Sequence, residues 1–190
     1  MAPLYLSENS TFEQIPPGTH FGVCTGIFDL GTSHDGLYNK DVRRVLIVWE
    51  IPDHEGKTLA AFYSFSLNNG SKLREHLDSW RGPLSPEEAK KLDLFSMLDE
   101  PAALTVIHKP NREGELRARV ESVGPLPDGI EPPRRRGPLL SFSFMDDDPE
   151  VPEETPDWIV NLIQKSDEWE ALTRPPDEEV GDEGDEADPF

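Results

Sequence analysis

The chain has 190 residues, enough for one domain with appendages, and its 38 acidic against 18 basic residues give a formal net charge of −20. From Met145 onward, 18 acidic residues face only Lys165 and Arg174, so the first 144 residues carry a net charge of just −4. The acidity therefore does not exclude nucleic-acid binding by the rest of the chain. One cysteine excludes an intramolecular disulfide. With no signal peptide and no long apolar run, the sequence predicts a cytoplasmic protein without a membrane partner.

Residues 18–123 show mostly strand-like periodicity. Phe21, Val23, Thr25 and Ile27 alternate in the first run, and RRVLIVWEI (43–51) is a nearly continuous β-branched and aromatic run. Such a run is typical of a strand that is covered on both faces. LAAFYSFSL (59–67) follows the turn HEGK as a third strand, and AALTVIHK (102–109) and GELRARVESVG (114–124) flank the turn PNREGE as two more.

Two helices are predicted between the third and fourth strands. Leu73, Leu77 and Trp80 form one helical stripe that begins after Ser71 and ends at Gly82, and a shorter helix begins after Ser85. This order of elements is that of the OB fold, a five-stranded Greek-key barrel with a helical insert between strands 3 and 4. The sequence therefore predicts a mostly β domain of that architecture.

The chain divides into five predicted regions. These are an irregular N-terminal segment over 1–17, the OB-fold domain over 18–127, a Pro- and charge-rich linker over 128–154, a helix over 155–173 and a disordered acidic tail over 174–190. The helix begins after Thr155 and carries an apolar stripe that includes Ile159 and Ile163. The tail has nothing to bury and repels itself, which favours disorder.

Motifs of catalysis are missing from the sequence. The five histidines are scattered, a single cysteine does not make the usual closed zinc site, and neither a phosphate-binding loop nor a nucleophile elbow is present. We interpret Asp146, Asp147 and Asp148 as a solvated charge run rather than metal ligands. The sequence predicts a protein that is not an enzyme and has no cofactor or metal.

Binding of single-stranded nucleic acid is the favoured function, because it needs a cationic groove and aromatic faces on which bases stack. In an OB barrel this surface is formed by strands 2 and 3 with the adjoining loops. The candidate DNA-binding residues are Lys40, Arg43, Arg44, Trp49, Lys57, Phe62, Tyr63, Lys72, Arg74, Arg81, Lys109, Arg112, Arg117 and Arg119.

Several of these candidates have two alternative interpretations. Trp49, Phe62 and Tyr63 are each either a stacking face or a core residue, and we lean slightly to a stacking face for Trp49. Trp80 is expected in the core, on the stripe with Leu73 and Leu77. The segment PPRRRGP (132–138) is either a phosphate-binding strap or an exposed linker that balances the charge of the tail.

The chain finishes with DEADPF, acidic residues followed by Pro-Phe. This layout, together with LREHLDSWRG (73–82), ESVGPLPDGIEPP and TPDWIVNLIQKSDEW, resembles a group of small phage-encoded single-stranded-DNA-binding proteins over residues 18–172. The resemblance implies an OB fold, sequence-independent binding of single strands in replication, recombination and repair, and a location in the host cytoplasm. It also implies that the tail recruits a polymerase, helicase or recombinase, and the candidate residues are Asp185, Glu186, Asp188, Pro189 and Phe190.

Two other classes stay open at this point. In a non-enzymatic adaptor or DNA-mimic inhibitor, the barrel would bind peptide and the acidic tail would mimic DNA to occupy a nuclease or other enzyme. Such a protein would not bind single strands even after removal of the tail. A metal-dependent nuclease would need a carboxylate cluster, and the domain sequence offers none. The sequence also leaves open whether the protein forms a homo-oligomer.

Overall fold

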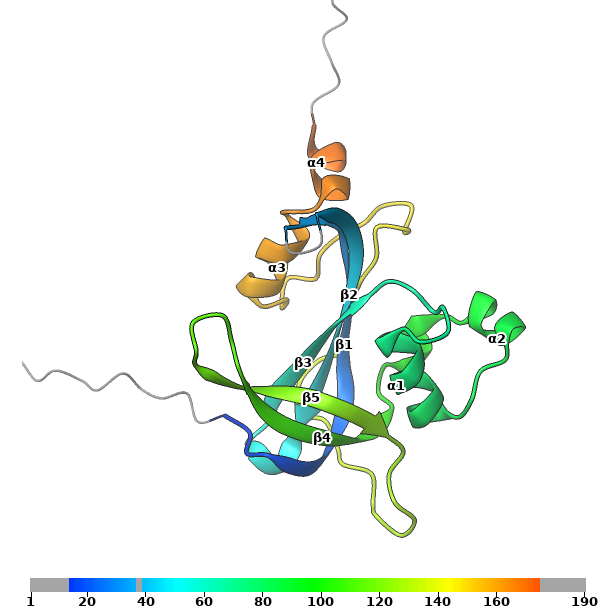
Figure 1. The fold of residues 1–190 in the computed structure, drawn as a ribbon, viewed down its shortest axis with the longest axis vertical. Helices are drawn as coiled ribbons and strands as arrows, with labels where there is room; N and C mark the ends of the chain where they lie inside the picture. Colours follow the sequence, from blue (N-terminus) through cyan, green and yellow to red (C-terminus); the bar gives the residue numbers. More distant parts are fainter. Residues whose placement is uncertain (1–13, 37–38, 175–190) are drawn as a thin grey trace, which may run out of the picture.

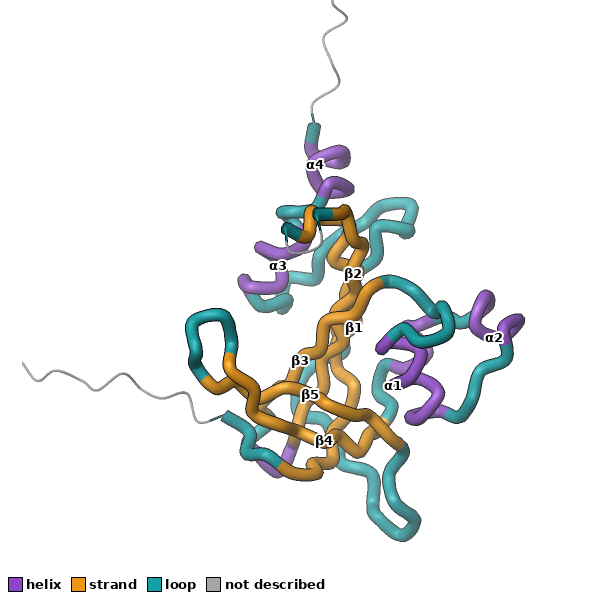
Figure 2. Tube along the Cα trace, viewed as in Figure 1, coloured by secondary structure: helices purple, strands orange, loops and turns teal. Residues whose placement is uncertain are grey.

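The computed structural model describes residues 14–36 and 39–174, and these residues form a mostly β fold with a few short helices (Figures 1 and 2). The strands are β1 (Gly18–Asp35), β2 (Lys40–Ile51), β3 (Lys57–Ser64), β4 (Pro101–Pro110), β5 (Leu116–Gly124) and β6 (Leu140–Phe142). The helices are α1 (Lys72–Arg81), α2 (Pro86–Lys91), α3 (Asp157–Ile163) and α4 (Asp167–Thr173), with the 3-10 turns η1 (Pro52–His54) and η2 (Leu94–Met97).

Five strands form one antiparallel sheet in the order β3-β2-β1-β4-β5, and the short β6 pairs in parallel with β1. The sheet curls, because β3 and β5 stand at the two ends of this order and yet contact each other. The long strand β1 produces this curvature, because it pairs with two different strands. Residues 18–23 pair with β4 and residues 23–35 with β2, and register shifts after Cys24 and after Asp29 mark bulges within the pairing with β2. Bulges bend a strand and increase its twist, so one strand can serve two parts of a barrel-like sheet.

The inner face of the curled sheet packs on α1 and forms the larger core. Trp49 and Leu104 of the sheet and Leu77 and Trp80 of α1 are among its buried side chains, so the prediction of Trp80 as core is confirmed. The helix begins as predicted, with the Ser71 side chain accepting a hydrogen bond from the backbone N–H of Arg74. Ser85 and Glu88 form a reciprocal capping box at the start of α2, which satisfies two N–H groups that the helix leaves unpaired.

The outer face of β1 and β2 packs against a second, smaller core. The run 43–51 indicated a strand covered on both faces, but the sequence did not predict which residues supply this cover. Phe28 and Leu46 of the sheet contact Phe142 of β6 and Ile159 and Ile163 of α3 in this cluster. Figure 1 shows α3 and α4 beside β1 and β2 and away from α1 and α2. The segment predicted as a linker over 128–154 therefore contributes a strand and buried aromatic side chains to the fold.

The structure also differs from the single helix predicted over 155–173, because α3 and α4 are separate helices. Ser166 divides them: its hydroxyl donates to the carbonyl of Ile163 and accepts from the N–H of Trp169, so it caps α4. Ser166 also sits tightly on Gly31, where a Cβ atom would lie 2.6 Å from the serine Cβ. Gly31 has φ of +68°, a conformation that glycine adopts without steric cost.

Along part of the edge of β5, the backbone groups form hydrogen bonds with side chains rather than with another strand. The amide group of Gln14 donates to the carbonyl of Leu116 at 2.9 Å and accepts from the N–H of Ala118 at 2.6 Å. Further along, His76 of α1 lies 3.1 Å from the carbonyl oxygen of Glu121. The helix α1 thus bridges β5 and β3, because His76 contacts Tyr63 of β3 as well as Glu121 of β5.

His76 predicts a pH dependence of stability. Because a carbonyl oxygen only accepts hydrogen bonds, Nε2 of His76 is the protonated nitrogen and donates to the carbonyl of Glu121. Nδ1 then accepts a hydrogen bond from the Tyr63 hydroxyl at 2.8 Å. Burial lowers the pKa of His76, and the charge of Lys72 also contributes to the lowering. The stabilisation is therefore present above the ordinary imidazole pKa of about 6.5 and is lost as the pH falls through the depressed value. Urea unfolding at a series of pH values should show this loss.

His76→Gln serves as the test of that assignment, with His34→Gln at an exposed position as control. The first variant should be less stable and should lose part of the pH dependence between pH 7 and 5, whereas the exposed control should stay close to the wild type in stability at pH 7. An unchanged profile in His76→Gln would show that another group titrates.

Candidate nucleic-acid interface

Two of the aromatic candidates are buried in the larger core. Trp49 is 1% exposed, and its ring packs on that of Trp80 with centroids 5.9 Å apart. Tyr63 is 3% exposed and donates its hydroxyl to His76. The stacking role considered for Trp49 and Tyr63 is therefore wrong. Both side chains point to the inner face, where a base has no access.

Arg74 is also a structural residue rather than a DNA contact. Its side chain is buried in α1, and its Nε lies 2.9 Å from both carboxylate oxygens of Asp78. The same guanidinium donates to the carbonyl groups of Leu67 and Leu84. The prediction for Arg74 is wrong because this cation ties the two ends of α1 to the neighbouring loops.

The two arginines at the start of β2 are held in ion pairs. Arg43 bonds to both carboxylate oxygens of the buried Asp29, and its guanidinium lies 4.9 Å from the centre of the Phe65 ring. The hydrogen bonds that Arg43 donates to Asp29 raise the pKa of Arg43. Arg44 bonds to Ser33 and to Asp35. Each guanidinium is mostly buried, and its charge is already balanced by a carboxylate.

The β4–β5 hairpin presents the clearest set of outward cations. Ala118 and Val120 pack inward, so Arg117 and Arg119 point outward from the same face, as predicted. In the strand register Lys109 lies opposite Arg117. Arg112 is exposed in the turn of the same hairpin, and neither Arg112 nor Arg119 has an ion-pair partner in the described part of the chain.

Two of these cations form ion pairs with carboxylates, which partly neutralise the cationic surface. Lys109 pairs with Glu121 at 3.2 Å, and Arg117 pairs with Glu115. The hydrogen bond from Lys109, together with its charge, lowers the pKa of Glu121. All four groups are at least 46% exposed, and exposed ion pairs contribute only about 0–1 kcal/mol. A phosphate can therefore replace either carboxylate at small cost.

Phe62 is the one aromatic candidate with an accessible ring. It is 52% exposed on the outer face of β3, and β3 contacts β5. We call the surface made by Phe62, Lys109, Arg112, Arg117 and Arg119 the β3–β5 face. Its aromatic side chain lies on β3, and its four cations lie on β4, β5 and the turn between them.

The remaining cationic candidates lie around this face or away from it. Lys72 is exposed at the start of α1, close enough to Glu121 for its charge to act on that carboxyl group. Arg81 stands at the other end of α1, about 14 Å along the helix axis, beside Glu87 and Glu88. Lys40 and Lys57 begin β2 and β3, and each has an interaction partner.

In an OB barrel the face of strand 2 is an expected binding surface, but here the outer face of β2 is covered by other parts of the chain. Leu46 and Val48 are covered by β6 and α3. Glu50 on the same face is 4% exposed, and its carboxylate accepts the backbone N–H groups of Arg136 and Gly137 at 2.7 and 2.9 Å. The arginine segment is thus fixed on the sheet through its backbone rather than lying free.

Sequence reasoning missed the acidic residues that hold the C-terminal part in place. Besides Glu50, Asp29 is 3.4 Å from the N–H of Phe144, and Glu168 accepts the N–H and hydroxyl of Thr32 at 2.6 and 2.7 Å. A signal was present for the first two, because an acidic residue inside an apolar strand needs a buried partner. The predicted partner-binding residues Asp185, Glu186, Asp188, Pro189 and Phe190 lie outside the described residues.

The described residues hold no cluster of three or more His, Cys, Asp or Glu side chains arranged for a metal ion, and none of their helices is long and apolar enough to cross a membrane. A scan against protein-family models found no matching family, and a search of curated proteins found no matching sequence. The likeness to phage single-stranded-DNA-binding proteins therefore stays a prediction, and the function is argued from the placement of the residues.

Replacing Trp49 and Phe62 separately with Ala should distinguish the core ring from the exposed one. Trp49→Ala empties a buried aromatic site and should lower the free energy of unfolding by about 3–5 kcal/mol. Phe62→Ala removes a half-exposed ring and should cost roughly 1 kcal/mol or less. Denaturant titrations measure both, and equal losses would contradict the assignment.

Proposed function

We propose that this protein binds single-stranded DNA without sequence preference, using the β3–β5 face of an OB-type barrel. The strand order, the helix between β3 and β4 and the contact between β3 and β5 all support that fold. The observation that carries the function is the pair Arg117 and Arg119, outward on β5 beside the strand that exposes Phe62.

The chemistry of this face suits a flexible strand. Two cations two residues apart on a strand are about 7 Å from each other, so they can contact one phosphate backbone together. An exposed ring on the neighbouring strand offers a stacking surface worth about 1–3 kcal/mol per base. Stacking and phosphate contacts do not read base edges, which favours binding without sequence preference.

The described helices support a preference for single strands over duplex. Reading a duplex commonly requires a helix placed in the major groove. The longest described helix, α1, buries Leu73, Leu77 and Trp80 against the sheet, and α2, α3 and α4 have only six or seven residues each. No described helix is therefore a suitable reader of duplex DNA.

We extend the proposal to recruitment of a replication or recombination protein by the acidic residues at 185–190. The support is their composition, acidic residues followed by Pro-Phe. The described helix that precedes them in the chain, α4, ends at Thr173 and is fixed to β1 through Glu168 and Thr32.

Binding to labelled oligo-dT tests the β3–β5 face. Each neutralised phosphate contact on a single strand contributes about −0.7 to the slope of log affinity against log salt, so four cations predict a slope of roughly −2 to −3. Changing Arg117 and Arg119 together to Ala should weaken binding and reduce the slope by roughly 1.4. Both side chains are exposed, so the melting temperature should stay close to that of the wild type.

The matched control removes two cations elsewhere: Lys90→Ala with Lys91→Ala, on α2. This variant should keep the wild-type slope. Equal effects of the two double variants would mean that general charge, not the β3–β5 face, attracts the strand. If the protein lacking residues 175–190 also has no affinity for oligo-dT, the proposal fails and the adaptor hypothesis is favoured.

A further inference from the structure

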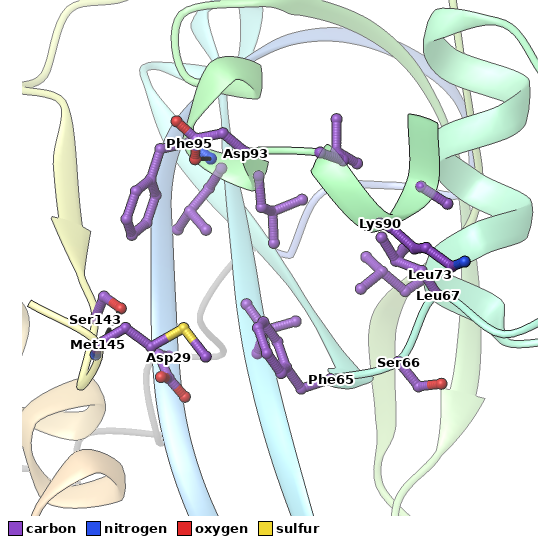
Figure 3. A pocket seen from close by; sticks show the side chains of 15 residues that line it. Asp29, Phe65, Ser66, Leu67, Leu73, Lys90, Asp93, Phe95, Ser143 and Met145 are labelled. Atoms are coloured by element: carbon purple, nitrogen blue, oxygen red, sulfur yellow. Dashed lines mark hydrogen bonds between the residues drawn. The ribbon is translucent and has the colours of Figure 1, made fainter. Parts of the chain in front are cut away.

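A hollow lies between the sheet and the helical insert, and none of its lining residues belongs to the β3–β5 face (Figure 3). Its volume is about 390 Å³, near the lower end of the range of about 300–1,000 Å³ that is typical of ligand sites. Its walls are mostly apolar and come from β1, β2, α1 and the insert, with Ile27, Val45, Leu73, Leu94 and Phe95 among them. Such a hollow accommodates one anchoring side chain rather than a large cofactor.

Two exposed apolar side chains border this hollow, which we call the insert pocket. Phe65 follows β3 and is 42% exposed, and Met145 follows β6 and is 68% exposed. Figure 3 shows both of them, with Phe95, around the opening. Exposed apolar groups that border an apolar hollow are typical of an interaction site. Methionine in particular adapts to partners of different shape.

The border of the insert pocket is held in place before any partner arrives. The guanidinium of Arg43 lies over the Phe65 ring, and the buried Asp29 anchors that guanidinium. Asp29 also accepts the N–H of Phe144, which fixes the chain next to Met145. A rigid border lowers the ordering cost of binding.

The charges near the opening select the partner. Asp93 is exposed on the border, and Asp146, Asp147 and Asp148, also exposed, follow Met145 in the chain. The one lysine of the lining, Lys90, is paired with Glu87, and Asp29 is paired with Arg43. The surroundings are therefore acidic, which repels nucleic acid and attracts cationic groups.

We propose that the insert pocket binds a partner protein through a short segment that inserts an apolar side chain and carries Lys or Arg on either side of it. Apolar burial supplies the anchor, and the acidic border supplies orientation and selectivity. This site is independent of the proposed DNA-binding face and of the acidic tail.

The test uses the full chain and a fluorescein-labelled peptide with a central Leu-Phe pair flanked on each side by Lys residues. Fluorescence anisotropy should show saturable binding. The same peptide with Ala-Ala at its centre, or with Glu in place of Lys, should bind at least about tenfold more weakly.

Ala89→Phe fills the pocket from α2, because Ala89 lines it, and should weaken peptide binding at least about tenfold. Ala171→Phe places the same change on the exposed side of α4 and should bind as the wild type does. Changing Asp146, Asp147 and Asp148 to Asn should weaken binding at low salt, with a difference that shrinks as salt rises.

A thermal melt shows whether Ala89→Phe is folded. If it is not, Met145→Ala replaces it, since Met145 is exposed and its removal leaves the fold intact while weakening the peptide several-fold. The proposal is overturned if the wild type shows no saturable binding, if the folded pocket variant binds normally, or if the Glu-flanked peptide binds equally well. A failure of oligo-dT binding alone leaves this proposal standing.

Discussion

The pairing of β1 with β2 is the constraint on which the rest of the structure depends, because both strands are apolar on both faces. Residues 45–51 of β2 are buried without interruption, and so are residues 22–31 of β1. A strand pair of this kind is stable in water only if both of its faces are covered. The curled sheet with α1 covers the inner face, and β6 with α3 covers the outer face. The C-terminal part is therefore required by the sheet.

Buried carboxylates make this cover specific. Glu50 and Asp29 lie within the apolar strands, and each accepts a backbone N–H from the segment that packs over them. Glu168 does the same in the other direction, since it reaches from α4 to the backbone of β1. A charged acceptor left without these donors would cost more than an ordinary lost hydrogen bond. The acids therefore favour one docked position for residues 136–168 over other apolar packings.

Covering the outer face of β1 and β2 also decides where binding can occur. OB barrels commonly bind their ligands on the face of strands 2 and 3, and here β6 and α3 cover part of the corresponding face. Phe62 of β3 and the β4–β5 hairpin stay exposed. The same segment brings Met145 and its following acids to the insert pocket. The β3–β5 face and the insert pocket thus differ in charge. The cationic one suits a phosphate backbone, and the acidic one suits a basic peptide.

The sequence by itself determined the local structure. Period-two patterns located the five main strands, and Ser71 and Ser85 marked the starts of α1 and α2, because caps and periodicity depend on residues close together in the chain. The outward placement of Arg117 and Arg119 followed from the same alternation. The tertiary structure alone decided that Trp49 and Tyr63 point inward, that Arg74 is buried beside Asp78, and that residues 140–163 cover the sheet. In a strand that is apolar on both faces, periodicity does not distinguish the core from an open face. That choice depends on what packs there, and for β2 the answer came from residues about a hundred positions away.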